Sequence, residues 1–110
     1  MSNQLVHFDV AGPDTEALSR FYSEVLTWSV QSQGPGYALI ETPGEGPNGA
    51  IVETDTPSIT IGIAVPDLDA TIAQAQRCGA NVVMPATNNG WVTKAQIQDP
   101  AGNLLTLIQA

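Results

Sequence analysis

His7 is the side chain best suited to chemistry, and it lies in an alternating segment, Leu5-Val6-His7-Phe8-Asp9-Val10. A period of two predicts a strand with His7 and Asp9 on one face and the apolar residues on the other. Imidazole can transfer a proton near neutral pH or bind a metal ion. Side chains two positions apart on a strand are about 7 Å apart at Cα, so a direct contact between His7 and Asp9 is left open. Two roles for His7 therefore stand side by side, contact with a ligand and a purely structural hydrogen bond.

Five further positions are candidates for a site. Glu53 could act as a general base or a metal ligand, although an exposed strand end is the slightly favoured interpretation. Thr60, Gly62 and Ala64 form a face of small residues, which leaves room for a ligand or allows close packing between modules or subunits. Trp91 follows Asn88-Asn89-Gly90 and is the aromatic side chain we expect to contact a flat ligand.

The composition excludes several classes of function. Eleven acidic and three basic residues give a formal charge of −8, which repels phosphate backbones and argues against nucleic-acid binding. The same charge favours cationic or neutral small ligands, and it also serves solubility. Cys78 is the single cysteine, so a Cys-based zinc site is not expected, and its place on an apolar helix stripe predicts burial. No signal segment or apolar stretch of membrane-spanning length is present, which predicts a cytoplasmic protein without membrane contact.

The same order of predicted strands and helices occurs twice along the chain. Strand patterns occupy residues 5–10, 28–30, 37–41 and 50–53, and then 59–65, 81–84, 91–98 and 104–108. Asp14 can cap a helix with an apolar stripe that includes Phe21 and Tyr22, both expected in the core. Asp67 or Asp69 can cap a second helix, which ends near Gly79.

This β-α-β-β-β repeat predicts a fold of the α+β class in a single domain, residues 1–110. Module one covers residues 1–53, a linker covers 54–58, and module two covers 59–110. Asp14 and Asp67 differ by 53 positions, as do Glu16 and Asp69. Neither half is large enough to bury a good core alone, so the modules should pack side by side around a shared concave cleft with the helices outside.

Several segments resemble those of one protein family in the same order. They are Val6-His7-Phe8-Asp9-Val10, Phe21-Tyr22, Val65-Pro66-Asp67-Leu68-Asp69-Ala70-Thr71, Gly79 and Asp99-Pro100-Ala101-Gly102-Asn103-Leu104. Together they resemble the vicinal oxygen chelate superfamily, which contains glyoxalases, bleomycin resistance proteins and dioxygenases. The resemblance extends over almost the whole chain and implies paired βαβββ modules.

The resemblance also implies a divalent metal held by four side chains from the first and last strands of the two modules. His7 matches the first of these positions, while Thr60 and Thr106 occupy two others. The fourth falls on Ile51, and a small shift of register would make Glu53 a ligand in its place. Two strong donors of four hold a divalent ion weakly, so no tight metal site and no cofactor are predicted. A bound Zn, Ni, Mn or Fe ion is the alternative.

These observations lead to one leading hypothesis and two rivals. The leading hypothesis is a metal-free domain that binds a hydrophobic or cationic small molecule in its cleft. The expected contacts come from His7, Asp9, Thr60, Gly62, Trp91 and Thr106. The first rival is a metal-dependent lyase, dioxygenase or epimerase with His7 and Glu53 as catalytic residues. The second is a cofactor-independent acid/base enzyme that relies on His7. The resemblance further implies a homodimer.

Overall fold

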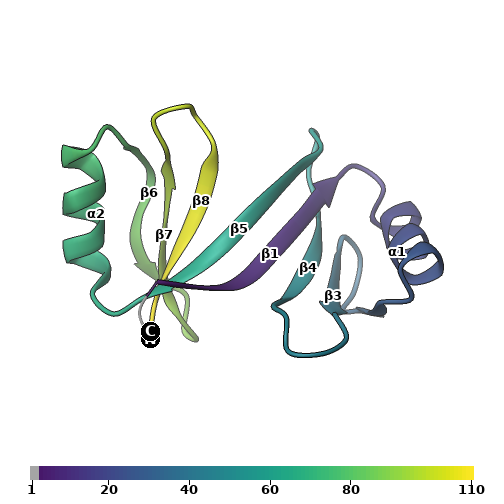
Figure 1. Ribbon diagram of the computed structural model, residues 1–110. Coiled ribbons are helices and arrows are strands. Elements are labelled where there is room, and N and C mark those ends of the chain that lie inside the picture. Colours follow the sequence, from purple (N-terminus) through teal and green to yellow (C-terminus); the bar gives the residue numbers. More distant parts are fainter. Residues whose placement is uncertain (1–2) are drawn as a thin grey trace. The chain divides into compact units, whose positions relative to one another are not determined.

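The computed structural model describes residues 3–110, which form two compact units with the same order of elements (Figure 1). The first unit spans Val6–Thr60, and the second spans Ile61–Ala110 with residues 3–5. Each has one helix and four strands in the order β-α-β-β-β. The α+β class and the repeated βαβββ order predicted from the sequence are thus confirmed.

The first unit is a four-stranded sheet with one helix packed on it. Its elements are β1 (Gln4–Gly12), α1 (Thr15–Val25), β2 (Ser29–Ser32), β3 (Tyr37–Glu41) and β4 (Asn48–Glu53). The strand order is β2-β3-β4-β1, with β1 parallel to β4 and the other neighbours antiparallel. The chain passes from β1 to its parallel neighbour β4 through α1, β2 and β3, since a parallel pair requires a long crossover connection.

The second unit repeats this arrangement. Its elements are β5 (Ser58–Val65), α2 (Leu68–Arg77), β6 (Asn81–Asn88), β7 (Thr93–Gln98) and β8 (Leu104–Gln109), in the strand order β5-β8-β7-β6. Strand β6 runs past Pro85, where its register against β7 shifts. A proline can be accommodated at such an irregularity, which is why the strand is longer than the sequence predicts.

Both helices begin at an aspartate. The Ala17 backbone N–H donates to Asp14 Oδ1 at 3.0 Å, and the Ala70 N–H donates to Asp67 Oδ1 at 3.1 Å. Each carboxylate satisfies a donor that the first helical turn leaves without a partner. Asp67 is therefore the cap of α2, and Asp69 lies in its first turn.

The core of the first unit lies between α1 and one face of its sheet. Ile40 and Ile51 are 1% and 0% exposed, and Ala38 is buried beside them. Five partly buried residues pack against this cluster: Phe8, Leu18, Tyr22, Trp28 and Val30. Burying one isoleucine side chain stabilises a fold by about 1.5–3 kcal/mol. This packing fixes which side chains of β1, β3 and β4 face the helix and which face the other way.

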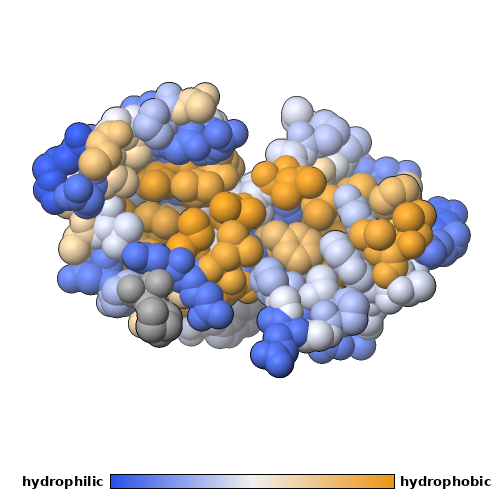
Figure 2. Space-filling view, in the orientation of Figure 1, coloured by the Kyte–Doolittle hydropathy of each residue, from blue (hydrophilic) through white to orange (hydrophobic). Residues whose placement is uncertain are grey.

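Two residues expected in the core are on the surface. Phe21 is 53% exposed on α1, and Cys78 is exposed at the C-terminal cap of α2. Val25 and Leu26 are also exposed, and Figure 2 shows apolar side chains at the surface over α1. The apolar stripe of α1 is wider than the strip that the sheet covers, so only Leu18 and Tyr22 reach the core. Within residues 3–110, α1 and α2 lack the length and apolarity of a membrane-spanning helix.

Candidate functional site

The sheet of the first unit has a second face, which points away from α1. Strand pairing brings polar residues into one row across this face. His7 on β1 pairs with Asn48 on β4, and the pairing of Ile40 with Gly49 places Glu41 of β3 on the other side of Asn48. Ser29 of β2 pairs with Glu41 and completes the row.

A groove of about 320 Å³ lies along this row, and we call it the His7 groove. It is lined by His7, Ser29, Gln31, Leu39, Ile40, Glu41, Asn48 and Gly49. The next row of the same face contains Asp9, Ala50, Leu39 and Gln31, as the strand registers show. The groove thus combines an imidazole, an amide and a carboxylate with the apolar side chain of Leu39, which is 40% exposed.

His7 and Asp9 are in direct contact. His7 Nε2 lies 2.9 Å from Asp9 Oδ1, and the two side chains are 36% and 30% exposed. The hydrogen bond that the strand spacing left open is therefore formed. Because an ionised carboxylate only accepts hydrogen bonds, Nε2 carries the hydrogen and donates it. In the neutral ring, Nδ1 is then the acceptor nitrogen.

Glu53 does not belong to this site. It pairs with Gly12, which is five residues beyond His7 on β1, a distance of about 17 Å along the strand. Glu53 shares the face of Ile51, which is buried against α1, whereas His7 is on the opposite face. The expectation that Glu53 could bind one ion together with His7 is therefore wrong.

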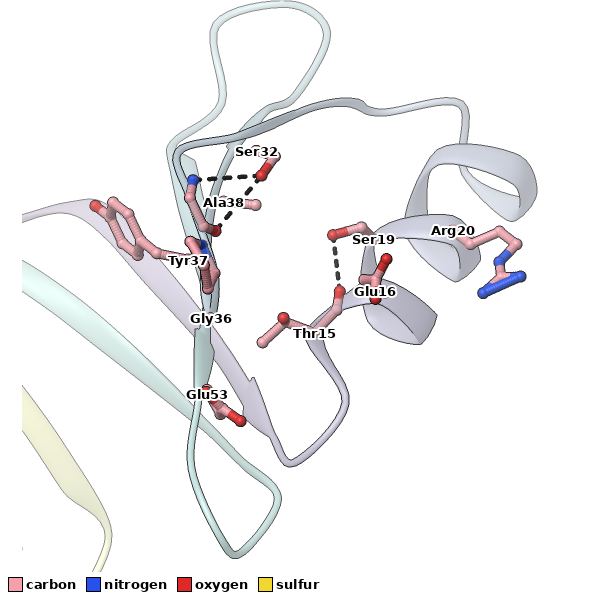
Figure 3. Close-up of a pocket in the computed structure, with 11 residues that line it drawn as sticks. Thr15, Glu16, Ser19, Arg20, Ser32, Gly36, Tyr37, Ala38 and Glu53 are labelled. Carbon is pink, nitrogen blue, oxygen red and sulfur yellow. Dashed lines mark hydrogen bonds between the residues drawn. The ribbon is translucent and has the colours of Figure 1, made fainter.

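Glu53 lies instead in a wider hollow of about 930 Å³ between α1 and the β2–β3 turn (Figure 3). Its carboxylate packs over Gly36, where a Cβ atom would come within 2.8 Å of Oε1. Arg20 and Tyr37 border this hollow, but both side chains point away from it in Figure 3. The hollow thus has carboxylates and hydroxyls on its walls and no imidazole.

The register also corrects the position of the fourth family ligand. Thr106 pairs with Gly62 in the second unit, and Asp9, 53 positions before Gly62, pairs with Ala50. Ala50 is therefore the counterpart of Thr106, and the sequence-based choice of Ile51 was wrong by one residue. Since side chains alternate between faces, an error of one residue exchanges the core face for the site face.

The other predicted contacts lie on β5, β7 and β8 or beside them. Thr60 and Thr106 are 8% and 7% exposed, and Gln96 Nε2 lies 3.5 Å from Thr106 Oγ1. Trp91 is 92% exposed in the turn before β7, five residues from Gln96, which pairs with Thr106. Trp91 lies outside β7, so the strand pairing does not place it beside Thr106.

The donor set does not fit a divalent metal ion. The four family positions are His7, Ala50, Thr60 and Thr106, which supply one imidazole and two hydroxyls. Across residues 3–110 no group of three or more His, Cys, Asp or Glu side chains could hold an ion. Hard divalent ions require several carboxylate, carbonyl or imidazole donors, so these residues provide too few.

Four polar residues of the groove were not predicted from the sequence: Ser29, Gln31, Glu41 and Asn48. Their signal was the alternation of β3, in which Ala38 and Ile40 are buried while Leu39 and Glu41 are exposed. That pattern predicts two faces, but only the pairing of β3 with β4 shows that Glu41 lies in the row of His7.

Negative charge is concentrated in the unit that contains the groove. Residues 6–60 include eight acidic and one basic side chain, a formal charge of −7, whereas residues 61–110 carry −1. The field around the His7 groove therefore attracts cations and repels anions.

Comparison with known proteins agrees with this architecture. A family model described as a glyoxalase-like domain matches residues 5–108. The chain belongs to this family. This match confirms the resemblance to glyoxalase-like proteins found in the sequence.

Solved structures share the fold at low sequence identity. Methylmalonyl-CoA epimerase from Mycobacterium tuberculosis is 20% identical, with a TM-score of 0.73 over 96% of this chain and 86% of that one. The Mn(II)-bound glyoxalase from Novosphingobium aromaticivorans is 18% identical, with a TM-score of 0.78 over 98% of this chain and 39% of that one. A superfamily member from Vibrio splendidus 12B01 is 13% identical, with a TM-score of 0.73 over 99% and 100% of the two chains. No curated protein matches the chain significantly.

Proposed function

We propose that this glyoxalase-like protein binds a small hydrophobic or cationic molecule in the His7 groove without the help of a metal. One observation carries the proposal. The groove offers polar and apolar contacts to an organic molecule, whereas the family's metal positions offer few metal ligands. His7, Glu41 and Asn48 offer polar contacts beside Leu39, while His7 alone among the family's metal positions is a strong donor. A metal site of this family has degenerated here, and an organic ligand uses the same face.

Size and charge support this function. Binding sites for small molecules range from about 300 to 1,000 Å³, and the groove of 320 Å³ falls at the lower end. Such sites combine an apolar wall with a few polar groups that orient the ligand. The charge of −7 on residues 6–60 raises the local concentration of cations and favours a cationic ligand over an anionic one.

Proteins of this fold bind small molecules. The Streptomyces coelicolor methylmalonyl-CoA epimerase was solved in complex with 2-nitronate-propionyl-CoA. Contacts from Thr60, Gly62, Trp91 and Thr106 to the ligand remain a prediction from the sequence. So do the homodimer and the cytoplasmic location, for which sedimentation and cell fractionation are the direct measurements.

A ligand screen tests the proposal. A library of small amines, aromatic amines and neutral aromatics is screened by thermal shift, and the compounds that stabilise the protein are mapped by NMR. We expect stabilising compounds to shift the backbone amide signals of Leu39, Glu41 and Asn48. If no compound stabilises the protein while a divalent metal does, the proposed function is wrong.

Acid/base catalysis without a cofactor is the second candidate, and the hydrogen bond between His7 and Asp9 favours it. A carboxylate that orients an imidazole is a common arrangement in proton transfer, and Glu41 lies two strands away as a second acid/base group. For a ligand found in the screen, this candidate predicts that its acidic C–H exchanges with D₂O in the presence of the protein. His7→Ala should then abolish exchange and leave ligand affinity nearly unchanged.

A metal-dependent enzyme is less well supported, because Glu53 lies on the wrong face of the sheet to assist His7. Such an enzyme would need strong donors from a second copy of the chain. Near-stoichiometric Zn, Ni, Mn or Fe in protein purified without chelators would favour it.

A further inference from the structure

We infer that Asp9 is a positioning residue that holds neutral His7 in the Nε2–H tautomer, so that the His7 groove selects a ligand donating an N–H, such as a small organic ammonium or amidinium. This inference rests on the proposed function and deepens it. It names the chemical class of the ligand and the residue that sets the selectivity.

The first step is the geometry of the imidazole. His7 Nε2 lies 2.9 Å from Asp9 Oδ1, which is within the range of a charge-assisted hydrogen bond. Neutral imidazole has a single N–H, and the carboxylate fixes it on Nε2. Nδ1 therefore presents a lone pair, which accepts a hydrogen bond and cannot donate one.

The other polar side chains of the groove include a second hydrogen-bond acceptor. Glu41 lies two strands from His7, about 10 Å away at Cα, and its carboxylate also accepts hydrogen bonds. Asn48 lies between them, and its Oδ1 already accepts from the Thr42 backbone N–H at 3.0 Å. Two acceptors, one of them charged, thus lie on either side of Asn48 in the groove, and the side-chain NH₂ of Asn48 is a donor between them. A ligand with several N–H donors satisfies both.

The groove can also contact the apolar part of the ligand. Leu39, which is 40% exposed, lies in the row next to Glu41 and Asn48 and lines the groove, so an apolar group attached to the cation meets an apolar side chain. An anion of the same shape meets the Glu41 carboxylate, with the Asp9 carboxylate beside His7. Burying charge next to like charge costs free energy, so the anion is excluded.

Imidazole NMR tests the tautomer directly. Long-range ¹H–¹⁵N spectra at a pH where His7 is neutral should show the proton on Nε2 in the wild-type protein. Asp9→Ala should give a mixture of the two tautomers. Asp55→Ala, which removes the same charge from the same unit away from His7, should leave the wild-type spectrum unchanged. A proton on Nδ1 in the wild type, or identical tautomers in wild type and Asp9→Ala, would overturn the role of Asp9.

Two probes of equal shape and opposite charge test the selectivity. Benzylammonium at millimolar concentration should shift the amide signals of Leu39, Glu41 and Asn48, and benzoate should not. Asp9→Ala should weaken benzylammonium binding about two- to tenfold, the effect of losing one oriented hydrogen bond, while Asp55→Ala should not.

The outcomes separate this inference from the proposed function. Binding of benzoate in the groove, or binding of neither probe, would overturn the ligand class. The proposed function would still stand if another small molecule from the screen bound there. If the whole screen left the groove unoccupied, both would fall.

Discussion

Gly49 lies where β4 passes close behind Phe8. A Cβ atom at this position would come within 2.6 Å of the Phe8 carbonyl oxygen and 2.7 Å of its ring. The Phe8 ring is itself held against Trp28, with ring centroids 5.7 Å apart. Because backbone and a packed ring both occupy the space, neither can move without disturbing the core, and β1 and β4 approach closely only when residue 49 has no side chain.

Gly49→Ala should therefore lower the free energy of unfolding by about 1–3 kcal/mol, the usual cost of overpacking. Urea denaturation measures this. Gly46→Ala is the matched control, since the nearest atom to its added Cβ, Thr42 Oγ1, is 3.6 Å away. Its effect should stay within about 0.5 kcal/mol. Equal losses in the two variants would mean that the close approach of β1 and β4 is not what Gly49 provides.

Asp99 holds the turn before β8 through hydrogen bonds from Asn103. The Asn103 side-chain amide donates to Oδ2 and its backbone N–H donates to Oδ1, each at 2.9 Å. These bonds, the side-chain bond first, lower the pKa of Asp99 below its ordinary value. A carboxylate whose pKa is lowered in the folded state stabilises the protein above its unfolded pKa, and this contribution is lost as the pH falls through the folded value.

We therefore expect the difference in unfolding free energy between wild type and Asp99→Ala to be present at pH 7. It should shrink as the pH falls below about 4, where an unperturbed aspartate becomes protonated. Urea unfolding at several pH values measures it. A difference independent of pH would show that the carboxylate charge is not responsible.

At the scale of the elements, local signals predicted most of the secondary structure. Asp14 predicted the start of the first helix, and the pair Asp67 and Asp69 predicted the start of the second, because a capping carboxylate acts within one turn. The register of β4 could not be predicted from local residue preferences. Whether Ala50 or Ile51 faces the site depends on the length of the loop before β4. The contact of His7 with Asp9 likewise depends on side-chain rotamers that alternation leaves open.

The capping role of Asp14 gives a direct prediction for α1. Asp14→Ala should lower the free energy of unfolding by about 0.5–2 kcal/mol, because the Ala17 N–H loses its acceptor. Asp14→Asn should cost much less, since asparagine caps helices almost as well. Chemical denaturation of both variants decides this, and equal losses for Ala and Asn would contradict the capping role.

Across the whole chain, the order of helices and strands is repeated but the side chains at the family's metal positions are not. The first unit holds the imidazole and a charge of −7, while the equivalent positions on β5 and β8 hold Thr60 and Thr106. The small number of metal-ligating side chains at these positions could be predicted from the sequence, because it depends only on residue identities. It could not predict the groove, because Ser29, Glu41 and Asn48 come from three strands whose pairing is a property of the folded sheet.

The central claim is that the His7 face holds too few donors for a metal ion and serves an organic ligand. Elemental analysis of protein purified without chelators tests this claim most directly. We expect Zn, Ni, Mn and Fe contents well below one ion per chain. About one metal ion per chain in the wild-type protein, absent from the His7→Ala variant, would contradict this claim.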